Sequence, residues 1–132
     1  MATQEESLAN WHRFIQQHDE HALAAALSEE VVYHSPLLWA PNNGKTPTIV
    51  NLTSAARVLE DFTYHQQFTG DNSVAFVFSA HIGAIQMRGV DIIQFGSDGL
   101  ISHLEVCLRT SAAMAVLSEG IIQQLTLKLE AR

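Results

Sequence analysis

The sequence predicts an α+β domain in which helices pack on the concave face of a curved sheet. Apolar residues recur at helical spacing in the N-terminal part of the chain, and strand-like segments separated by turn residues fill residues 62–109. A further helical pattern begins near Ser111. Because the helices come first and the strands follow one another through short turns, we expect a mostly antiparallel sheet.

The N-terminal part predicts two helices. Leu8, Trp11 and Ile15 lie at helical spacing, and His18 continues the row. This spacing indicates one apolar face on a first helix. Asp19 can then cap a short second helix that is rich in alanine and leucine.

A strand and a third helix follow. Residues 29–36, EEVVYHSP, are typical of a strand that stops at Pro36, because proline pushes the preceding residue to an extended conformation. Thr46 and Pro47 then look like a helix cap and the first helical position. We expect this third helix to continue through Leu59.

The second half predicts an antiparallel four-strand meander and a last helix. The strand segments are DFTYHQQFT, VAFVFSAHI, MRGVDIIQF and LISHLEVCLR. Ser111 can cap the last helix, whose apolar stripe is Met114, Leu117, Ile121 and Leu125. Gly120 inside this helix costs about 1 kcal/mol relative to alanine.

Composition limits the classes of function. With 132 residues, 47% of them hydrophobic and 16% charged, the chain predicts a single domain over residues 1–132 with room for a pocket. It has 14 acidic against 7 basic residues and no cluster of lysine or arginine. We therefore expect neither nucleic acid nor a membrane as a partner, and no apolar run approaches the roughly 20 residues that span a bilayer.

Metal, cofactor and disulfide chemistry are not indicated. His18 and His21 have a spacing that could hold a metal, but no obvious third ligand lies close by, so we expect no metal site. There is no G-x-S-x-G motif, Gly-rich phosphate loop or dinucleotide fingerprint, so we expect no cofactor. Cys107 is the only cysteine and the N-terminus does not look like a signal peptide. This predicts a cytoplasmic protein.

The order of these features resembles a known family. Two helices, a strand ending in x-P, a P-N-N-G loop and a third helix precede the meander, which carries G-V-D at residues 89–91 and D-G-L-I at residues 98–101. Over about residues 6–128 this resembles the nuclear transport factor 2-like superfamily and, within it, the SnoaL-like branch. The resemblance implies a cone-shaped α+β barrel with a deep apolar pocket, as in polyketide cyclases, ketosteroid isomerases and limonene epoxide hydrolases. It also implies a homodimer formed through the outer face of the sheet.

The resemblance implies one catalytic candidate. The first-helix tyrosine and the aspartate of steroid isomerases fall at Trp11 and Ser35, and the final-strand acid of cyclases and epoxide hydrolases falls at Val106. None of these three side chains can carry the proton. Asp91 matches the second acid of steroid isomerases, which donates a hydrogen bond to the developing oxyanion.

Alternation along the strands indicates which side chains share a face with this acid. On the last strand the expected inward residues are Leu100, Ser102, Leu104, Val106 and Leu108. On the preceding strand both faces carry apolar residues, so only the resemblance aims Asp91 inward. Burial would raise the pKa of Asp91 and suit it to proton transfer. The alternative is an aspartate that only satisfies a neighbouring tyrosine, histidine or backbone group; its possible polar partners are Tyr33, Tyr64, Ser35, His65 and His81.

The loop HSPLLWAPNNGK, residues 34–45, is expected to lie over the mouth of the cone. On this interpretation Leu37, Leu38 and Trp39 face a ligand. The alternative is that the loop plugs the barrel or packs on a partner subunit. Sequence alone leaves both open.

We therefore expect a small hydrophobic ligand around Asp91. The predicted ligand-binding residues are Trp11, Tyr33, Ser35, Trp39, Phe76, Phe78, His81, Met87, Leu104 and Val106. Three hypotheses remain: a cofactor-free isomerase, cyclase or hydratase with Asp91 as acid/base, a binding protein without turnover, and a dimeric interaction module whose cone is filled by its own side chains.

Overall fold

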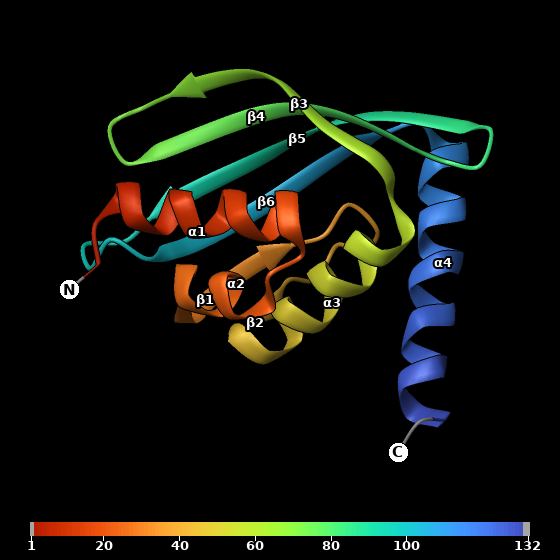
Figure 1. Cartoon of the computed structure of the whole chain (residues 1–132), viewed down its shortest axis with the longest axis horizontal. Helices are drawn as coiled ribbons and strands as arrows, with labels where there is room; N and C mark the ends of the chain where they lie inside the picture. The colour runs from red at the N-terminus through yellow and green to blue at the C-terminus, as the bar shows by residue number, and fades with distance from the viewer. Residues whose placement is uncertain (1, 131–132) are drawn as a thin grey trace.

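A curved sheet wraps around the N-terminal helices (Figure 1). The computed structural model describes residues 2–130. Its helices are α1 (Gln4–Gln17), α2 (Glu20–Ala26), α3 (Lys45–Val58) and α4 (Ser111–Glu130). Its strands are β1 (Leu27–His34), β2 (Asn42–Asn43), β3 (Glu60–Thr69), β4 (Ser73–Ile82), β5 (Ile85–Phe95) and β6 (Ile101–Arg109). The predicted α+β class is confirmed.

The strands form one sheet in the order β2-β1-β6-β5-β4-β3. The predicted meander β3–β6 is confirmed, since its neighbouring strands pair antiparallel. β1 pairs parallel with β6, which extends the sheet beyond the meander. Figure 1 shows α1, α2 and α3 on the inner side of the curved sheet and α4 at one end of it. No helix within residues 2–130 is both long and apolar enough to cross a membrane.

A bulge changes the inward face of the last strand. Gln94 pairs with His103 but Phe95 pairs with Ile101, so Ser102 is an extra residue on β6. Ile101 is therefore fully buried, whereas the expected inward residues Leu100 and Ser102 are only half-buried. From Leu104 onward the predicted alternation holds, with Leu104 buried and Val106 half-buried.

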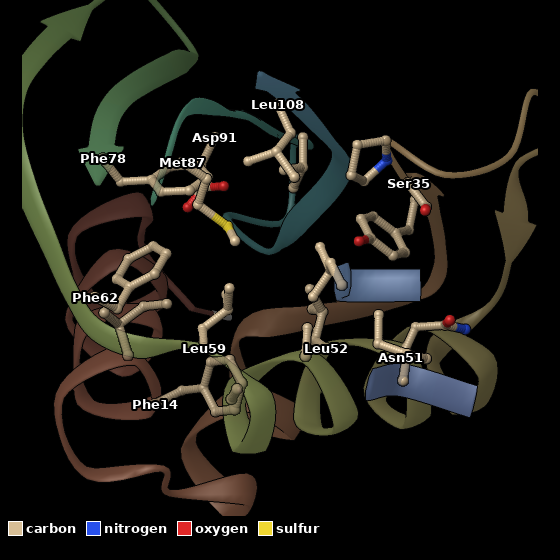
Figure 2. A pocket seen from close by; sticks show the side chains of 18 of the residues that line it. Phe14, Ser35, Asn51, Leu52, Leu59, Phe62, Phe78, Met87, Asp91 and Leu108 are labelled. Atoms are coloured by element: carbon tan, nitrogen blue, oxygen red, sulfur yellow. The ribbon is translucent and has the colours of Figure 1, made fainter. Parts of the chain in front are cut away.

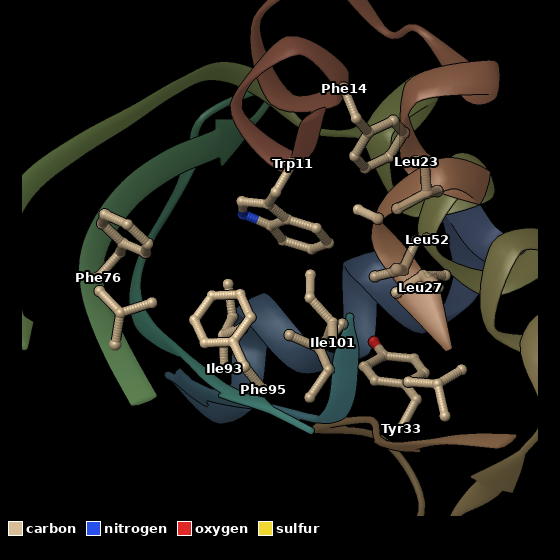
Figure 3. Packing of buried hydrophobic residues seen from close by; sticks show 14 residues of the cluster. Trp11, Phe14, Leu23, Leu27, Tyr33, Leu52, Phe76, Ile93, Phe95 and Ile101 are labelled. Carbon is tan, nitrogen blue, oxygen red and sulfur yellow. The ribbon is translucent and has the colours of Figure 1, made fainter. Parts of the chain in front are cut away.

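The inner face of the sheet is divided into a filled part and a hollow part. Near the β5–β6 turn, side chains pack into a closed core; its members from the meander are Val74, Phe76, Ile93, Phe95, Ile101 and Leu104 (Figure 3). Toward the opposite ends of the same strands, the inward residues line a cavity instead; they are Phe78, Met87, Asp91, Val106 and Leu108. The self-filled cone is therefore right for one end of the barrel only.

Two of the predicted helix caps are wrong. α3 begins at Lys45, so its cap is Gly44, whose φ of 96° suits glycine, and not Thr46. At the start of α4 the side chain of Thr110, not that of Ser111, accepts a hydrogen bond from the Ala113 amide at 3.5 Å. The predicted Asp19 cap is confirmed, since its carboxylate accepts from the Ala22 amide at 3.0 Å.

Candidate functional site

The hollow end of the barrel is an apolar cavity of about 460 Å³. The sheet forms one wall, and α1, α3 and α4 provide the others (Figure 2). Its larger apolar side chains are Phe14, Ile15, Leu37, Leu52, Leu59, Phe62, Phe78, Met87, Leu108, Leu117 and Ile121. None of the described residues that line it is a lysine or an arginine. Among the described lining residues, His18 is the one side chain that could pair with an anion, and the walls are otherwise mostly apolar, so the cavity suits a hydrophobic molecule.

Asp91 lies where the filled core meets the cavity. Its position in β5 pairs with Phe76 on β4 and with Val106 on β6, so apolar side chains flank it. The residue is 4% exposed, and its carboxyl group is seen among the lining side chains (Figure 2). Burial raises the pKa of Asp91 to about 7, and the hydrogen bond from Tyr64 partly opposes this shift. The carboxyl group can therefore gain and lose a proton near neutral pH.

A chain of hydrogen bonds leads from α1 to this carboxyl group. The indole N–H of Trp11 donates to the hydroxyl oxygen of Tyr64 at 2.9 Å. The Tyr64 hydroxyl donates to Oδ2 of Asp91 at 2.5 Å. Tyr64 is held in place by stacking on Phe76, with ring centroids 4.5 Å apart. The alternative in which Asp91 is satisfied by a neighbouring tyrosine is thus correct for one of its two oxygens.

A second tyrosine, Tyr33, is buried and lies near enough to feel the charge of this carboxyl group. Burial and the charge of Asp91 raise the pKa of Tyr33, so its phenol stays protonated. Ser35, two residues further along, accepts a hydrogen bond from the Leu37 amide at 3.0 Å. Both Tyr33 and Ser35 line the cavity and offer hydroxyl groups to a bound molecule.

The structure brings most of the predicted site residues together. Those that line the cavity are Asp91, Trp11, Tyr33, Ser35, Phe78, Met87 and Val106. Phe76 and Leu104 lie in the filled core: Leu104 pairs with Ile93, on the filled side of Asp91, and Phe76 pairs with Asp91 itself and packs in the core. These two residues do not line the cavity, contrary to expectation.

Trp39 lies outside the cavity, contrary to expectation. Its side chain is 99% exposed, and Leu38 beside it is 67% exposed. The turn closed by the Ser35 hydroxyl and the Leu37 amide brings Pro36 and Leu37 to the cavity and leaves the next two residues outside. The loop contributes to the cavity wall through its first residues only.

His81 also lies outside the cavity. Its ring nitrogens contact Asp61 Oδ2 at 2.7 Å and the Gly83 carbonyl oxygen at 3.0 Å. The hydrogen bond to Asp61 is the main cause of the raised pKa of His81. These contacts join the start of β3 to the end of β4. Of His81 and Asp61, only Asp61 lines the cavity.

Sequence reasoning missed part of the cavity wall. Phe62 lies two residues before Tyr64 on β3 and stacks on Phe78 with ring centroids 4.7 Å apart, so strand alternation could have found it. Leu52 and Leu117 come from α3 and α4, and nothing in their local sequence shows that these helices close the cavity. Within the described residues no three His, Cys, Asp or Glu side chains are grouped as a metal site would require.

Comparison with known families matches the SnoaL-like domain to residues 8–104. The chain belongs to the SnoaL-like family. The match begins in α1 and ends in β6, so it includes strands β1 to β5 and the first residues of β6. None of the curated proteins matches this SnoaL-like chain significantly.

Solved structures show the same fold. A steroid delta-isomerase from Pseudomonas aeruginosa is 32% identical with a TM-score of 0.92, and the match covers 98% of this chain and 96% of that chain. A protein with a cystatin-like fold from Silicibacter pomeroyi is 23% identical with a TM-score of 0.85, over 91% of this chain and 85% of that one. An NTF2-like protein from Mesorhizobium loti is 18% identical with a TM-score of 0.68, over 83% and 96%. The predicted nuclear transport factor 2-like cone is confirmed.

Proposed function

We propose that this SnoaL-like domain binds a neutral hydrophobic molecule with a carbonyl group and catalyses a cofactor-free isomerisation, with Asp91 moving the proton. The observation that carries the proposal is the buried Asp91 carboxyl group in the wall of an apolar cavity. The 32% identity to a steroid delta-isomerase over nearly the whole chain supports the reaction class. It makes a β,γ-unsaturated ketosteroid the first substrate to test.

The roles follow from the protonation states of two side chains in the cavity: Asp91 can gain and lose a proton near neutral pH, and Tyr33 stays protonated. As a carboxylate, Asp91 takes a proton from the carbon next to the carbonyl group, and the electron pair moves to the oxygen as an enolate. The protonated phenol of Tyr33 donates a hydrogen bond to that oxygen. The protonated Asp91 then gives a proton to the γ carbon at the other end of the enolate system, so the double bond shifts and nothing is oxidised or reduced.

The alternative is a binding protein without turnover. It is favoured by Ser35, which stands where the resemblance places the catalytic aspartate of steroid isomerases and has no useful basicity near neutral pH. The two functions share the cavity and differ only in what Asp91 does. Asp91→Asn keeps the shape of the side chain and removes proton transfer, so this variant separates them.

A thermal-shift screen tests the ligand class. The panel is ketosteroids, terpenoid ketones, aromatic polyketides and fatty acids, and the proteins are the wild type, Asp91→Asn and Leu38→Ala, whose side chain points away from the cavity. A ligand at 100 times its dissociation constant adds about 2.7 kcal/mol, which raises the melting temperature clearly. We expect ketones to stabilise the wild type and Leu38→Ala equally. Stabilisation by fatty acids alone, or by no class, would contradict the proposal.

We also propose that two copies of the chain pair through the outer face of the sheet. Its centre is apolar, with Val77, Val90 and Ile92 half-buried, and Arg88 and Arg109 lie directly opposite each other toward one end. Like charges so placed repel each other. In a two-fold dimer, Arg88 and Arg109 of one subunit can pair with Glu105 of the partner subunit across the apolar centre.

Sedimentation at micromolar concentration tests the dimer. We expect Glu105→Arg to weaken it and the charge-reversed double variant Glu105→Arg with Arg109→Glu to restore it. A monomeric wild type, or no response to either variant, would contradict this pairing.

A further inference from the structure

We propose that Trp11 and Tyr64 form a hydrogen-bond chain of fixed direction that ends on Oδ2 of Asp91 and keeps this oxygen as an acceptor. The other oxygen, Oδ1, is then the one that takes up and releases the proton of the carboxyl group. This inference rests on the proposed role of Asp91 and assigns Trp11 and Tyr64 as positioning residues. The family resemblance assigns neither role, since Trp11 stands where a tyrosine is expected.

The direction of the chain is set by its first member. An indole N–H can donate but cannot accept, so Tyr64 must act as the acceptor in the 2.9 Å contact with Trp11. The hydroxyl group of Tyr64 can therefore donate its single proton to another acceptor. Within the described residues the only further polar partner of that hydroxyl group is Oδ2 of Asp91, at 2.5 Å.

The other oxygen meets the cavity. Oδ1 of Asp91 makes no hydrogen bond to any of the described residues, and no fully buried polar side-chain atom among them lacks a partner. Oδ1 is therefore not sealed in protein and borders open space, which at this position is the cavity that Asp91 lines. A proton on Oδ2 would point at the Tyr64 proton and disrupt that hydrogen bond. A proton on Oδ1 points into the cavity, where a ligand can accept it.

Infrared spectroscopy of the ligand-free protein can locate the proton. At about pH 5 ordinary aspartates are ionised and Asp91 is protonated, so its C=O stretch can be assigned by subtracting the spectrum of Asp91→Asn. If Oδ1 carries the proton, the C=O oxygen is Oδ2, which accepts from Tyr64. Losing that hydrogen bond in Tyr64→Phe then shifts the stretch to higher frequency.

Titration of the same variants tests the link to Trp11. We expect Tyr64→Phe to raise the pKa of Asp91 by about 1 unit, because the lost hydrogen bond favoured the charged form. Trp11→Phe should raise it by a smaller amount, although Trp11 does not touch Asp91, because the phenol becomes a weaker donor. The matched control is Ile93→Val, which changes packing two residues from Asp91 on the same face of β5. It should leave the pKa of Asp91 unchanged.

The outcomes separate the two proposals. An unchanged C=O stretch in Tyr64→Phe would place the proton on Oδ2 and contradict the proposed hydrogen-bond chain. This infrared comparison tests the proposal even if Trp11→Phe does not fold. A Trp11→Phe titration equal to that of the wild type or of Ile93→Val would also overturn it. Because both measurements use the free protein, a failure to find turnover would contradict the proposed isomerase and leave this result standing.

Discussion

Asp91 is the residue on which the proposed function depends, and the sequence alone could only half predict its environment. Alternation on β5 left both faces apolar, so the inward direction came from the family resemblance, and the structure agrees with it. Its partner Tyr64 lies 27 positions earlier, and β4 separates their strands. Such a pairing depends on strand register across two neighbours, which no local pattern fixes.

The raised pKa of Asp91 makes stability depend on pH. Between its ordinary value of 3.8 and about 7, the folded state holds a proton that the unfolded chain has lost. The free energy of unfolding therefore falls as pH rises through this window, by roughly 4 kcal/mol in total from this residue. Asp91→Asn has no such titration.

Urea denaturation at about pH 5 and about pH 8 measures this effect. We expect the wild type to lose more stability between the two pH values than Asp91→Asn does. Parallel losses in the two proteins would show that Asp91 is not a buried, titrating group.

At the scale of elements, periodicity predicted the helices and the meander, and failed where long-range packing decides. The parallel pairing of β1 with β6 joins segments that are about 70 residues apart in sequence, so no turn signal announces it. The cap of α3 depends on the positive φ of Gly44 rather than on the Thr-Pro pair that follows. Gly120, an apparent weakness of α4, lies against Val58 of α3.

This contact predicts the effect of Gly120→Ala. A Cβ at this position would lie 2.5 Å from Cγ1 of Val58. The usual gain of about 1 kcal/mol in helix propensity should be outweighed by overpacking of about 1–3 kcal/mol. We expect a lower melting temperature for Gly120→Ala, and less of a loss when Val58→Ala is added. A more stable single variant would show that α4 does not pack closely on α3.

At the scale of the molecule, one end of the cone is filled and the other is hollow. The sequence left a pocket and a self-filled cone as alternatives, because the closure depends on where α3 and α4 lie against the sheet. The boundary explains the misplaced residues: Leu104 lies on the filled side of Asp91 and Phe78 on the hollow side. Phe76 and Val106 lie level with Asp91, and Phe76 packs in the core whereas Val106 lines the cavity. A single buried carboxyl group at this boundary is what the proposed proton transfer requires.

The most direct test of that proposal is deuterium incorporation at the carbon next to the carbonyl group of a β,γ-unsaturated ketosteroid in D₂O, followed by NMR with the wild type and Asp91→Asn. We expect the wild type to accelerate the exchange, with a rate that rises with pH through about 7 as Asp91 becomes the carboxylate. Asp91→Asn should retain binding of the ketone and lose the exchange. Binding without exchange in the wild type, or equal exchange in both proteins, would contradict proton transfer by Asp91.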